Sequence, residues 1–365
     1  MAKKNKVAII GTNGLPARYG GFETLTNYLV ESLSNDFDIT VYCSKTPKKK
    51  RLNNYKGATL KYFPLKANGW QSMLYDFITI FDAYFKSENL IILGFSGAFA
   101  FPFNKLFRKN IIFNIGGIEW EKVRGSKWSS NLEIALKKWM EKVCVKNSQT
   151  VIIDNISFLD YVKRTYNVTP VLAEYGGDHA KHHPITQEIV SKYSFINNPY
   201  DITVSRAQYD MNIHMIIEAY KSIPNRTVVI VSNWNISSYG IELYEKNHNK
   251  YPNIILLNAI YDQRELNTLR SNCKLYLHTH SLCGTAPSLV EAMYLNLPII
   301  SYDVVANRAT TEDKAHYFKN ADELLELLTN ISNEEIEHNR KKMKIIADNR
   351  YRWERITGIY KENIH

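Results

Sequence analysis

The sequence lacks the patterns that define a disulfide framework, a zinc finger or a membrane-spanning helix. Its four cysteines form no Cys-x-x-Cys pair and lie far apart, at Cys43, Cys144, Cys273 and Cys283. They are expected to be reduced thiols in a cytoplasmic protein. The longest stretch without a charge or a histidine, 89–104, is interrupted by two glycines and a proline. It is shorter than the roughly 20 apolar residues that a spanning helix needs, so we interpret it as a buried strand followed by an apolar loop, with a membrane-touching loop as the alternative.

Acidic residues are outnumbered by basic ones, 36 against 46, which gives a net charge of +10 and a pI of about 9.1. The basic residues gather in the first half, in 45–51, 105–109, 122–127 and 137–146. No recognised nucleic-acid motif accompanies them, so nucleic acid is not an expected partner. Most of these segments are interpreted as solvated helix faces, and an anionic membrane surface is the best functional alternative.

Short β-rich apolar runs alternate with longer helical patterns, which is typical of parallel sheets wrapped by helices. The strands predicted for the first half are Val7–Ile10, Asp38–Tyr42, Thr59–Phe63, Leu90–Leu93, Ile111–Ile115, Val151–Ile153 and Val171–Ala173. Those predicted for the second half are Ile202–Ser205, Thr227–Val231, Ile254–Leu257, Lys274–Leu277 and Ile299–Tyr302. The fold class is therefore α/β, with two doubly wound, Rossmann-like domains at 1–180 and 181–350.

A glycine-rich loop follows the first predicted strand, in Gly11–Thr24. It contains neither the Gly-x-Gly-x-x-Gly fingerprint nor a P-loop. Glycines let the backbone approach a ligand, and the next helix begins with free N–H groups. We therefore interpret the loop as a ligand site that includes Gly14, Gly20 and Gly21, with Arg18 and Tyr19 embedded in it.

A second candidate segment, His278–Met293, follows a strand and opens a helix. Thr285 is the candidate cap and Pro287 lies in the first helical turn, where its missing N–H is harmless. The positive end of this helix is a natural place for a diphosphate. Glu291 is expected to face the same crevice and to bind vicinal ribose hydroxyls.

These two segments resemble glycosyltransferase family 4, and within it the rhamnosyltransferase-like branch. The opening Gly-Thr-x-Gly-x-Pro-Ala-x-Tyr-Gly-Gly-Phe-Glu-Thr matches residues 11–24, and Ser-x-x-Gly-Thr-x-Pro-Ser-Leu-x-Glu-Ala-Met matches residues 281–293. The resemblance spans nearly the whole chain. It implies a GT-B fold in which the C-terminal domain holds a nucleotide-sugar and the N-terminal domain holds the acceptor. It also implies that 351–365 forms a final helix that crosses back to the N-terminal domain.

On the donor side, the resemblance makes Glu291 the second glutamate of the family's pair, and Cys283 stands where the first would be. Sugar recognition is therefore expected to use the backbone amides of Gly284, Thr285 and Ala286. Gly14, Gly20 and Gly21 of the first loop are also expected to contact the donor. Arg206 fits the arginine of the family's phosphate clamp, while Met211 replaces its lysine.

On the acceptor side, the resemblance implies a role for Arg18, Tyr19, Glu119 and Trp120. Many relatives have an aspartate where this chain has Gly116, so Glu119 and Asp154 are the candidate general bases. Arg206 completes the catalytic set by stabilising the leaving diphosphate.

The expected reaction moves L-rhamnose from dTDP-L-rhamnose to a saccharide acceptor, often lipid-diphosphate-linked, at the inner membrane face. The family retains anomeric configuration. No cofactor or metal is expected, and the Asp36-Phe37-Asp38 segment is dismissed as a metal site although it has the right spacing. The alternatives are a UDP-hexose donor, a sugar-nucleotide epimerase, and a binding module without turnover.

Overall fold

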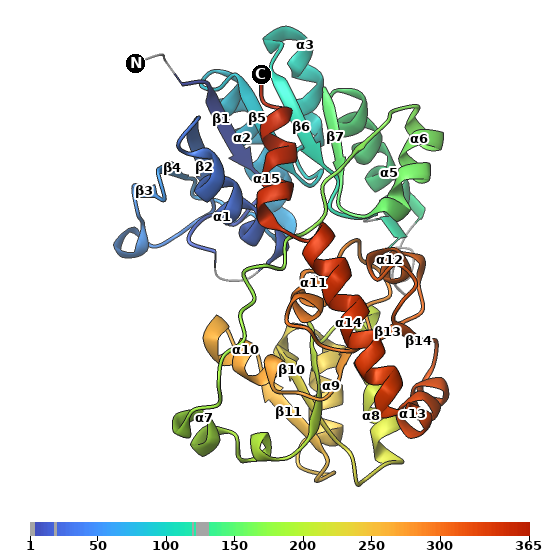
Figure 1. Cartoon of the computed structure of the whole chain (residues 1–365). Helices are drawn as coiled ribbons and strands as arrows, with labels where there is room; N and C mark the ends of the chain where they lie inside the picture. Colours follow the sequence, from blue (N-terminus) through green and yellow to red (C-terminus); the bar gives the residue numbers. More distant parts are fainter. Residues whose placement is uncertain (1–3, 18–19, 119, 122–130) are drawn as a thin grey trace. The chain divides into compact units, whose positions relative to one another are not determined.

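The computed structural model describes residues 4–17, 20–118, 120–121 and 131–365 (Figure 1). The chain divides into two compact units. The first comprises the residues up to Glu174 together with Trp353–His365, and the second comprises Tyr175–Arg352. These boundaries lie a few residues from the expected ones at 180 and 351. The chain thus returns to its first unit only for its last helix.

The first unit is built on a sheet of eight described strands. In spatial order they are β3 (Asn54–Tyr55), β4 (Ala58–Tyr62), β2 (Asp38–Cys43), β1 (Lys6–Ile10), β5 (Asn89–Leu93), β6 (Asn110–Asn114), β7 (Thr150–Ile153) and β8 (Val171–Leu172). The pair β3–β4 is antiparallel and the other described pairs are parallel. β1 lies between β2 and β5, so the strand order changes direction beside β1.

Helices cover this sheet, and the central strands β1 and β5 are almost fully buried. The described α-helices are α1 (Gly21–Leu33), α2 (Ser72–Tyr84), α3 (Asn104–Phe107), α5 (Asn131–Lys146), α6 (Leu159–Tyr166) and α15 (Trp353–Glu362). A strand buried on both faces reads as a continuous apolar run, as Val7–Ile10 does. Such runs made these strands visible in the sequence.

The last helix, α15, packs on the first unit beside α1 (Figure 1). Trp353 stacks on Tyr28 with the ring centroids 4.3 Å apart. The Thr357 hydroxyl donates to the Ser32 hydroxyl at 3.0 Å. Near the end of the helix, the Tyr360 hydroxyl accepts a hydrogen bond of 2.6 Å from the Asn114 amide. The tail is thus part of the first unit's core rather than an appendage.

The second unit has a sheet of six described strands. In spatial order they are β11 (Ile254–Asn258), β10 (Thr227–Ser232), β9 (Tyr200–Val204), β12 (Tyr276–His278), β13 (Ile299–Tyr302) and β14 (His316–Phe318). All the described pairs are parallel. Its helices are α7 (Gln187–Lys192), α8 (Ile213–Lys221), α9 (Ser238–Asn247), α10 (Gln263–Ser271), α11 (Pro287–Tyr294), α12 (Val305–Thr310), α13 (Ala321–Asn330) and α14 (Asn333–Arg350).

Every strand predicted from the sequence is present, which confirms two Rossmann-like α/β units. The sequence analysis missed β3 and β14. Both are very short edge strands with polar or aromatic residues, so neither shows an apolar run of the usual length. Within the described ranges, no helix is both long enough and apolar enough to cross a membrane.

We expect Trp353→Ala to destabilise the first unit by about 3–5 kcal/mol, because the change leaves a cavity against α1. Urea unfolding followed by circular dichroism measures the effect. Arg355→Ala, on the exposed side of the same helix, is the matched control and should unfold like the parent. Equal unfolding midpoints for the two variants would contradict a structural role of α15.

Candidate functional site

The strand order of the second sheet changes direction between β9 and β12, which are neighbours. Arg206 follows the carboxyl end of β9, and the segment 279–286 follows the carboxyl end of β12. In doubly wound sheets, ligands bind in the crevice outside the carboxyl ends of the strands at such a switch point. The fold therefore places two of the segments selected from the sequence at the same crevice.

The start of the segment 279–286 is fastened to the loop that follows β9. The Thr279 hydroxyl donates to the carbonyl oxygen of Met211, and the Asn212 amide donates to the carbonyl of Thr279 at 3.0 Å. Both the amide and the hydroxyl of Ser281 donate to the carbonyl of Asp210 at 2.9 Å. Met211, which stands where the resemblance places the lysine of the phosphate clamp, and its neighbour Asn212 thus hold the start of the segment 279–286.

Helix α11 begins directly after this segment. Its N-cap is Ala286, no side chain caps it, and Pro287 is in the first turn. The expectation that Thr285 is the cap is therefore wrong: Thr285 lies one residue too early for its side chain to reach the second or third helical N–H. An uncapped helix start leaves backbone N–H groups for an anionic ligand.

Glu291 lies in the second turn of α11 and is held by two side chains of the same unit. Its Oε2 accepts a hydrogen bond from Nη1 of the buried Arg270, and its Oε1 lies 3.0 Å from Nε2 of His179. Arg270 also donates to Asn267 at 2.7 Å. Burial alone would raise the pKa of Glu291, but the charge of Arg270 and the contact with His179 outweigh it and lower the pKa to about 2. Glu291 is thus a fixed carboxylate with lone pairs left for further donors.

His179, the other partner of Glu291, is largely buried. Its side chain is only 15% exposed and is paired with Glu291. The two residues are 112 positions apart in the sequence. No local pattern marks His179 or Arg270 as a partner, so the sequence analysis could not find either.

Arg206 is the cation at the carboxyl end of β9. Its charge acts on His280, which follows β12. The pKa of His280 is lowered mainly by burial, then by the neighbouring His278, and also by the charge of Arg206. Arg308, on α12 of the same unit, is occupied by a two-pronged contact with Asp303, at 2.5 and 3.0 Å. No ion pair of Arg206 is found within the described part of the chain. Arg206 therefore has charge to offer an anion.

The loop after β1 in the first unit is organised by Glu23, which the sequence analysis overlooked. Its Oε1 accepts hydrogen bonds from the backbone and the side-chain amide of Asn13, at 2.9 and 2.8 Å. Gly14 and Gly20 have φ angles of 111° and 122°, which L-residues other than glycine rarely adopt. Gly14 and Gly20 are thus needed for the conformation of the loop. Contact of Gly14, Gly20 and Gly21 with the donor stays a prediction. Arg18 and Tyr19 lie outside the described residues.

Trp120 has an evident structural role. It is 9% exposed, and its indole N–H donates to the Tyr161 hydroxyl at 3.0 Å. That hydroxyl donates in turn to Glu141 at 2.6 Å. Because the ring is buried and its N–H is used, contact between Trp120 and an acceptor stays a prediction without structural support. Glu119 lies outside the described residues.

Two carboxyl groups lie at the carboxyl edge of the first sheet. Asp154, the predicted base, directly follows β7. Burial raises the pKa of the Tyr360 hydroxyl, and the nearby charge of Asp154 raises it further. Asp76, on α2, was missed by the sequence analysis. Its Oδ1 is buried without a hydrogen-bond partner, and burial, opposed by a hydrogen bond from Ser96, raises its pKa to about 7. A carboxyl group that titrates near neutrality is suited to acid–base work.

The Asp36-Phe37-Asp38 segment lies at the opposite edge of this sheet. Asp36 precedes β2, at the amino end of the strand, and forms an ion pair with Lys361 at 2.7 Å. Ligands of doubly wound sheets bind at the carboxyl ends. The location therefore argues against a role for these two aspartates in donor binding.

Two family models match the chain, one for each unit. Residues 4–178 match a domain of unknown function, DUF1972, and residues 187–350 match glycosyl transferases group 1. No curated protein is significantly similar to the chain in sequence.

Solved structures with the same fold align over nearly the whole chain. Sucrose-phosphate synthase from Thermosynechococcus elongatus has a TM-score of 0.82 at 16% identity, over 98% of both chains. HepE from Anabaena, in complex with UDP and glucose, has a TM-score of 0.75 at 15% identity, over 98% of both chains. The catalytic domain of Arabidopsis thaliana starch synthase IV, bound to ADP and acarbose, has a TM-score of 0.70 at 13% identity, over 99% of both chains.

The fold and the family models define a class. The chain has the GT-B fold, in which a DUF1972 domain precedes a glycosyl transferases group 1 domain.

The raised pKa of Asp76 predicts how stability depends on pH. The folded state binds a proton that the unfolded state releases above pH 3.8, so stability falls as pH rises from about 4 to about 7. Asp76→Asn should remove this fall, which amounts to a few kcal/mol at about 1.4 kcal/mol per pKa unit. Urea unfolding at pH 5 and pH 8 tests it, with Asp160→Asn on the exposed face of α6 as the control. A variant that keeps the parent's pH slope would contradict the assignment.

Proposed function

We propose that this protein is a glycosyltransferase that moves L-rhamnose from dTDP-L-rhamnose to a saccharide acceptor carried on a lipid diphosphate, in the assembly of a surface polysaccharide. The second unit holds the donor and the first unit holds the acceptor. The donor is a substrate, so no cofactor is needed, and no metal ion takes part in the transfer.

The observation that carries the donor site is the combination of charges at the switch point of the second sheet. Arg206, without a counter-ion among the described residues, and the uncapped start of α11 both favour an anion. Glu291 adds a carboxylate kept ionised by Arg270. A nucleoside diphosphate has the matching chemistry, since its diphosphate needs cationic and N–H groups and its ribose offers hydroxyl donors.

The donor sugar is inferred from the sequence of the donor loop. The segment from Ser281 to Met293 resembles the rhamnosyltransferase-like branch, and Cys283 takes the place of the carboxylate that grips a hexose in many relatives. A 6-deoxy sugar has one hydroxyl fewer to satisfy. The alternative is a UDP-hexose, which is favoured by the UDP and glucose bound to HepE.

In the proposed reaction, the bond between the sugar's anomeric carbon and the diphosphate oxygen breaks, and a bond to the acceptor oxygen forms on the same face. The acceptor proton passes to the departing diphosphate, assisted by Asp154 or Glu119. Arg206 and the N–H groups of the loop Gly284–Ala286 stabilise the negative charge that develops on the leaving group. Electrostatic stabilisation of this kind is usually the largest single contribution to catalysis.

A lipid-linked acceptor is supported by an apolar face on the first unit. Its exposed side chains come from α2, the 3-10 helix Ala98–Phe103, α3 and α5: Leu74, Phe85, Phe99, Phe103, Leu106 and Trp139. Ring contacts connect these elements, with centroids 5.2 Å apart for Phe99–Trp139 and 4.9 Å apart for Phe85–Phe107. Aromatic side chains that are exposed together mark an interaction surface.

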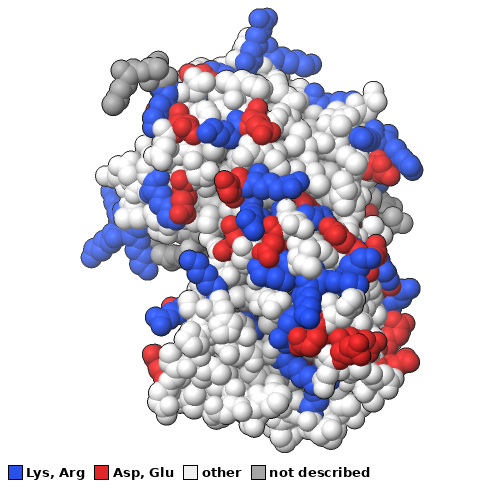
Figure 2. All heavy atoms as spheres, in the orientation of Figure 1, with Lys and Arg blue, Asp and Glu red and all other residues white. Residues whose placement is uncertain are grey.

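Basic side chains accompany the apolar face. Lys105 and Arg108 are exposed on and beside α3, and Lys138 and Lys142 are exposed on α5. Figure 2 shows Lys and Arg projecting from the tip of the unit formed by α3. An apolar face with basic side chains complements an anionic membrane surface, to which each basic residue contributes about 1 kcal/mol.

A panel of nucleotide-sugars, tested with and without a saccharide acceptor, tests the proposed reaction. We expect sugar transfer from dTDP-L-rhamnose that depends on the acceptor. Transfer only from a UDP-hexose would favour the alternative donor. Conversion of the donor without any acceptor would identify an epimerase, and the absence of turnover with every donor would identify a binding module.

The role of Glu291 is tested through the ribose. Thymidine diphosphate offers only a 3′-hydroxyl, whereas uridine diphosphate offers both 2′ and 3′. A hydrogen bond to a charged group contributes about 1.5–3 kcal/mol, so Glu291→Gln should weaken dTDP binding about tenfold. Calorimetric titration measures this, with Glu245→Gln on the exposed face of α9 as the control. Unchanged affinity would contradict the ribose contact, and a much stronger preference of the parent for UDP would contradict the dTDP donor.

The membrane surface is tested by flotation with anionic vesicles. The parent should float with the vesicles at low salt and dissociate as the salt concentration rises. Leu106→Asp should abolish flotation, because it places a charge in the apolar face. Ile345 on α14 is also an exposed aliphatic residue, at 60% against 78% for Leu106, and Ile345→Asp should float like the parent. Flotation that survives Leu106→Asp would exclude the apolar face as the contact.

A further inference from the structure

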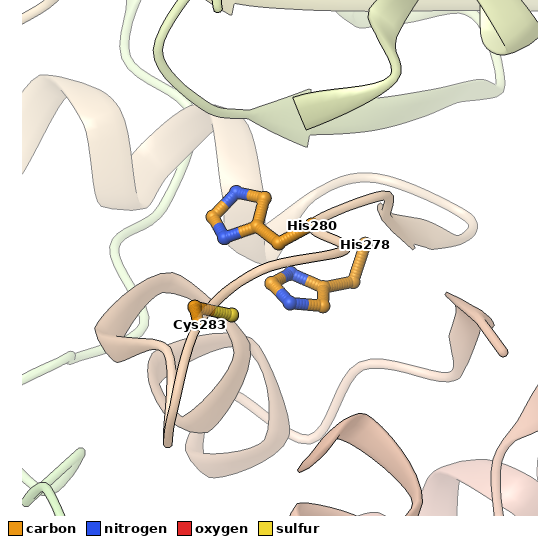
Figure 3. Close-up of side chains that lie close together, drawn as sticks. All are labelled: His278, His280 and Cys283. Atoms are coloured by element: carbon orange, nitrogen blue, oxygen red, sulfur yellow. The ribbon is translucent and has the colours of Figure 1, made fainter. Parts of the chain in front are cut away.

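Two histidines and a cysteine converge at the carboxyl end of β12 (Figure 3). His278 is the last residue of the strand, His280 follows two residues later and Cys283 three residues after that. Each offers one atom that can bind a metal, and these atoms all lie within 4.8 Å of one another. Figure 3 shows the sulfur of Cys283 directed toward the two imidazole rings.

The two imidazoles are not satisfied by the protein around them. Both ring nitrogens of His278 and Nε2 of His280 are buried without a hydrogen-bond partner. The ring centroids are only 4.2 Å apart. A buried polar atom without a partner costs free energy, and most native examples have a structural or functional explanation.

The unpartnered nitrogens are the atoms through which a neutral imidazole binds a metal, and they face the thiol of Cys283 across less than 4.8 Å.

We propose that His278, His280 and Cys283 form a binding site for a borderline-soft divalent cation of the Zn²⁺ type. Nitrogen and thiolate ligands favour zinc over magnesium, calcium or manganese, which prefer oxygen. Cys283 releases its proton to solvent when the metal–sulfur bond forms, so the thiolate offsets one of the two positive charges brought beside Arg206.

The geometry allows a tetrahedral ion with small movements of the side chains. Bonds of about 2.0–2.3 Å to nitrogen and sulfur put neighbouring ligand atoms roughly 3.5 Å apart. The ligand atoms, which lie within 4.8 Å of one another, therefore need to approach by up to about 1.3 Å. Asn307 lies beside His278, and its buried Oδ1 has no hydrogen-bond partner, so it is placed to accept the second ring N–H and orient the ligand.

Three protein ligands leave one coordination position open. Cys283 directly precedes the loop Gly284–Ala286, which we assign to the donor, so an occupied site would restrain the start of that loop. The proposal concerns binding of the ion, not the chemistry of transfer. A negative result would leave the proposed sugar transfer unaffected.

Cobalt, which takes the same ligands as zinc and absorbs light when bound by thiolate, is the direct probe. Added to metal-free protein without donor or acceptor, Co²⁺ should give a thiolate-to-metal absorption band that Zn²⁺ removes. Cys283→Ala should lose the band, and His280→Ala should weaken Zn²⁺ binding at least tenfold. His182→Ala, an exposed histidine of the same unit, is the matched control and should bind like the parent.

A second measurement keeps the test independent of folding defects. Zn²⁺ binds only the folded site, so it should raise the melting temperature of the parent and of His182→Ala but not that of Cys283→Ala. The proposal is overturned if the parent shows no cobalt band. It is equally overturned if Cys283→Ala keeps the band, or if Zn²⁺ raises the melting temperature of Cys283→Ala as much as that of the parent.

Discussion

The second unit depends on the buried ion pair between Arg270 and Glu291. Arg270 is almost completely buried and cannot lose its charge, so a carboxylate must stay beside it. Removing one member of such a pair typically costs 3–5 kcal/mol, because the other charge is left buried and uncompensated. The pair links α10 to α11, and His179 links both to the segment that enters the second unit. The start of α11, and with it the crevice after β12, is therefore held in place by electrostatics as well as by packing.

The pair with Arg270 also prepares Glu291 to bind a ligand. A carboxylate with two partners has lone pairs left, and its lowered pKa keeps it an acceptor over the whole physiological range. Arg308 is paired with Asp303, whereas no ion pair of Arg206 is found among the described residues. This distribution puts an acceptor and a cation at one strand edge, which suits a ligand with hydroxyls at one end and phosphates at the other.

The first unit shows a different use of burial. Asp76 and the network of Glu141 with Tyr161 and Tyr166 are carboxyl groups surrounded by apolar side chains, and burial raises the pKa of both. Meanwhile, aromatic side chains remain exposed just after α2, on the 3-10 helix Ala98–Phe103 and on α5, although the core beneath them is well filled. A protein that needed only to fold would not require such an exposed apolar face. We propose that this face binds the lipid of the acceptor, because the crevice of the second unit is assigned to the donor alone.

What the sequence determined by itself is the local structure. Runs such as Val7–Ile10 and Thr227–Val231 predict buried strands because side chains on both faces of a covered parallel sheet must be apolar. The order of strands and helices then defines two α/β units. The motifs predicted which loops carry the chemistry, since glycines and a proline at fixed offsets specify how a strand turns into a helix.

Only the tertiary structure decided which distant side chains meet. The pairing of Glu291 with His179 spans 112 residues, and α15 returns to α1 across the whole second unit. Neither is visible in a sequence window, because no local periodicity encodes a contact between segments so far apart. The convergence of His278, His280 and Cys283 is local in sequence, yet it depends on the turn after β12, and that turn is set by hydrogen bonds to Asp210 and Met211 on another loop.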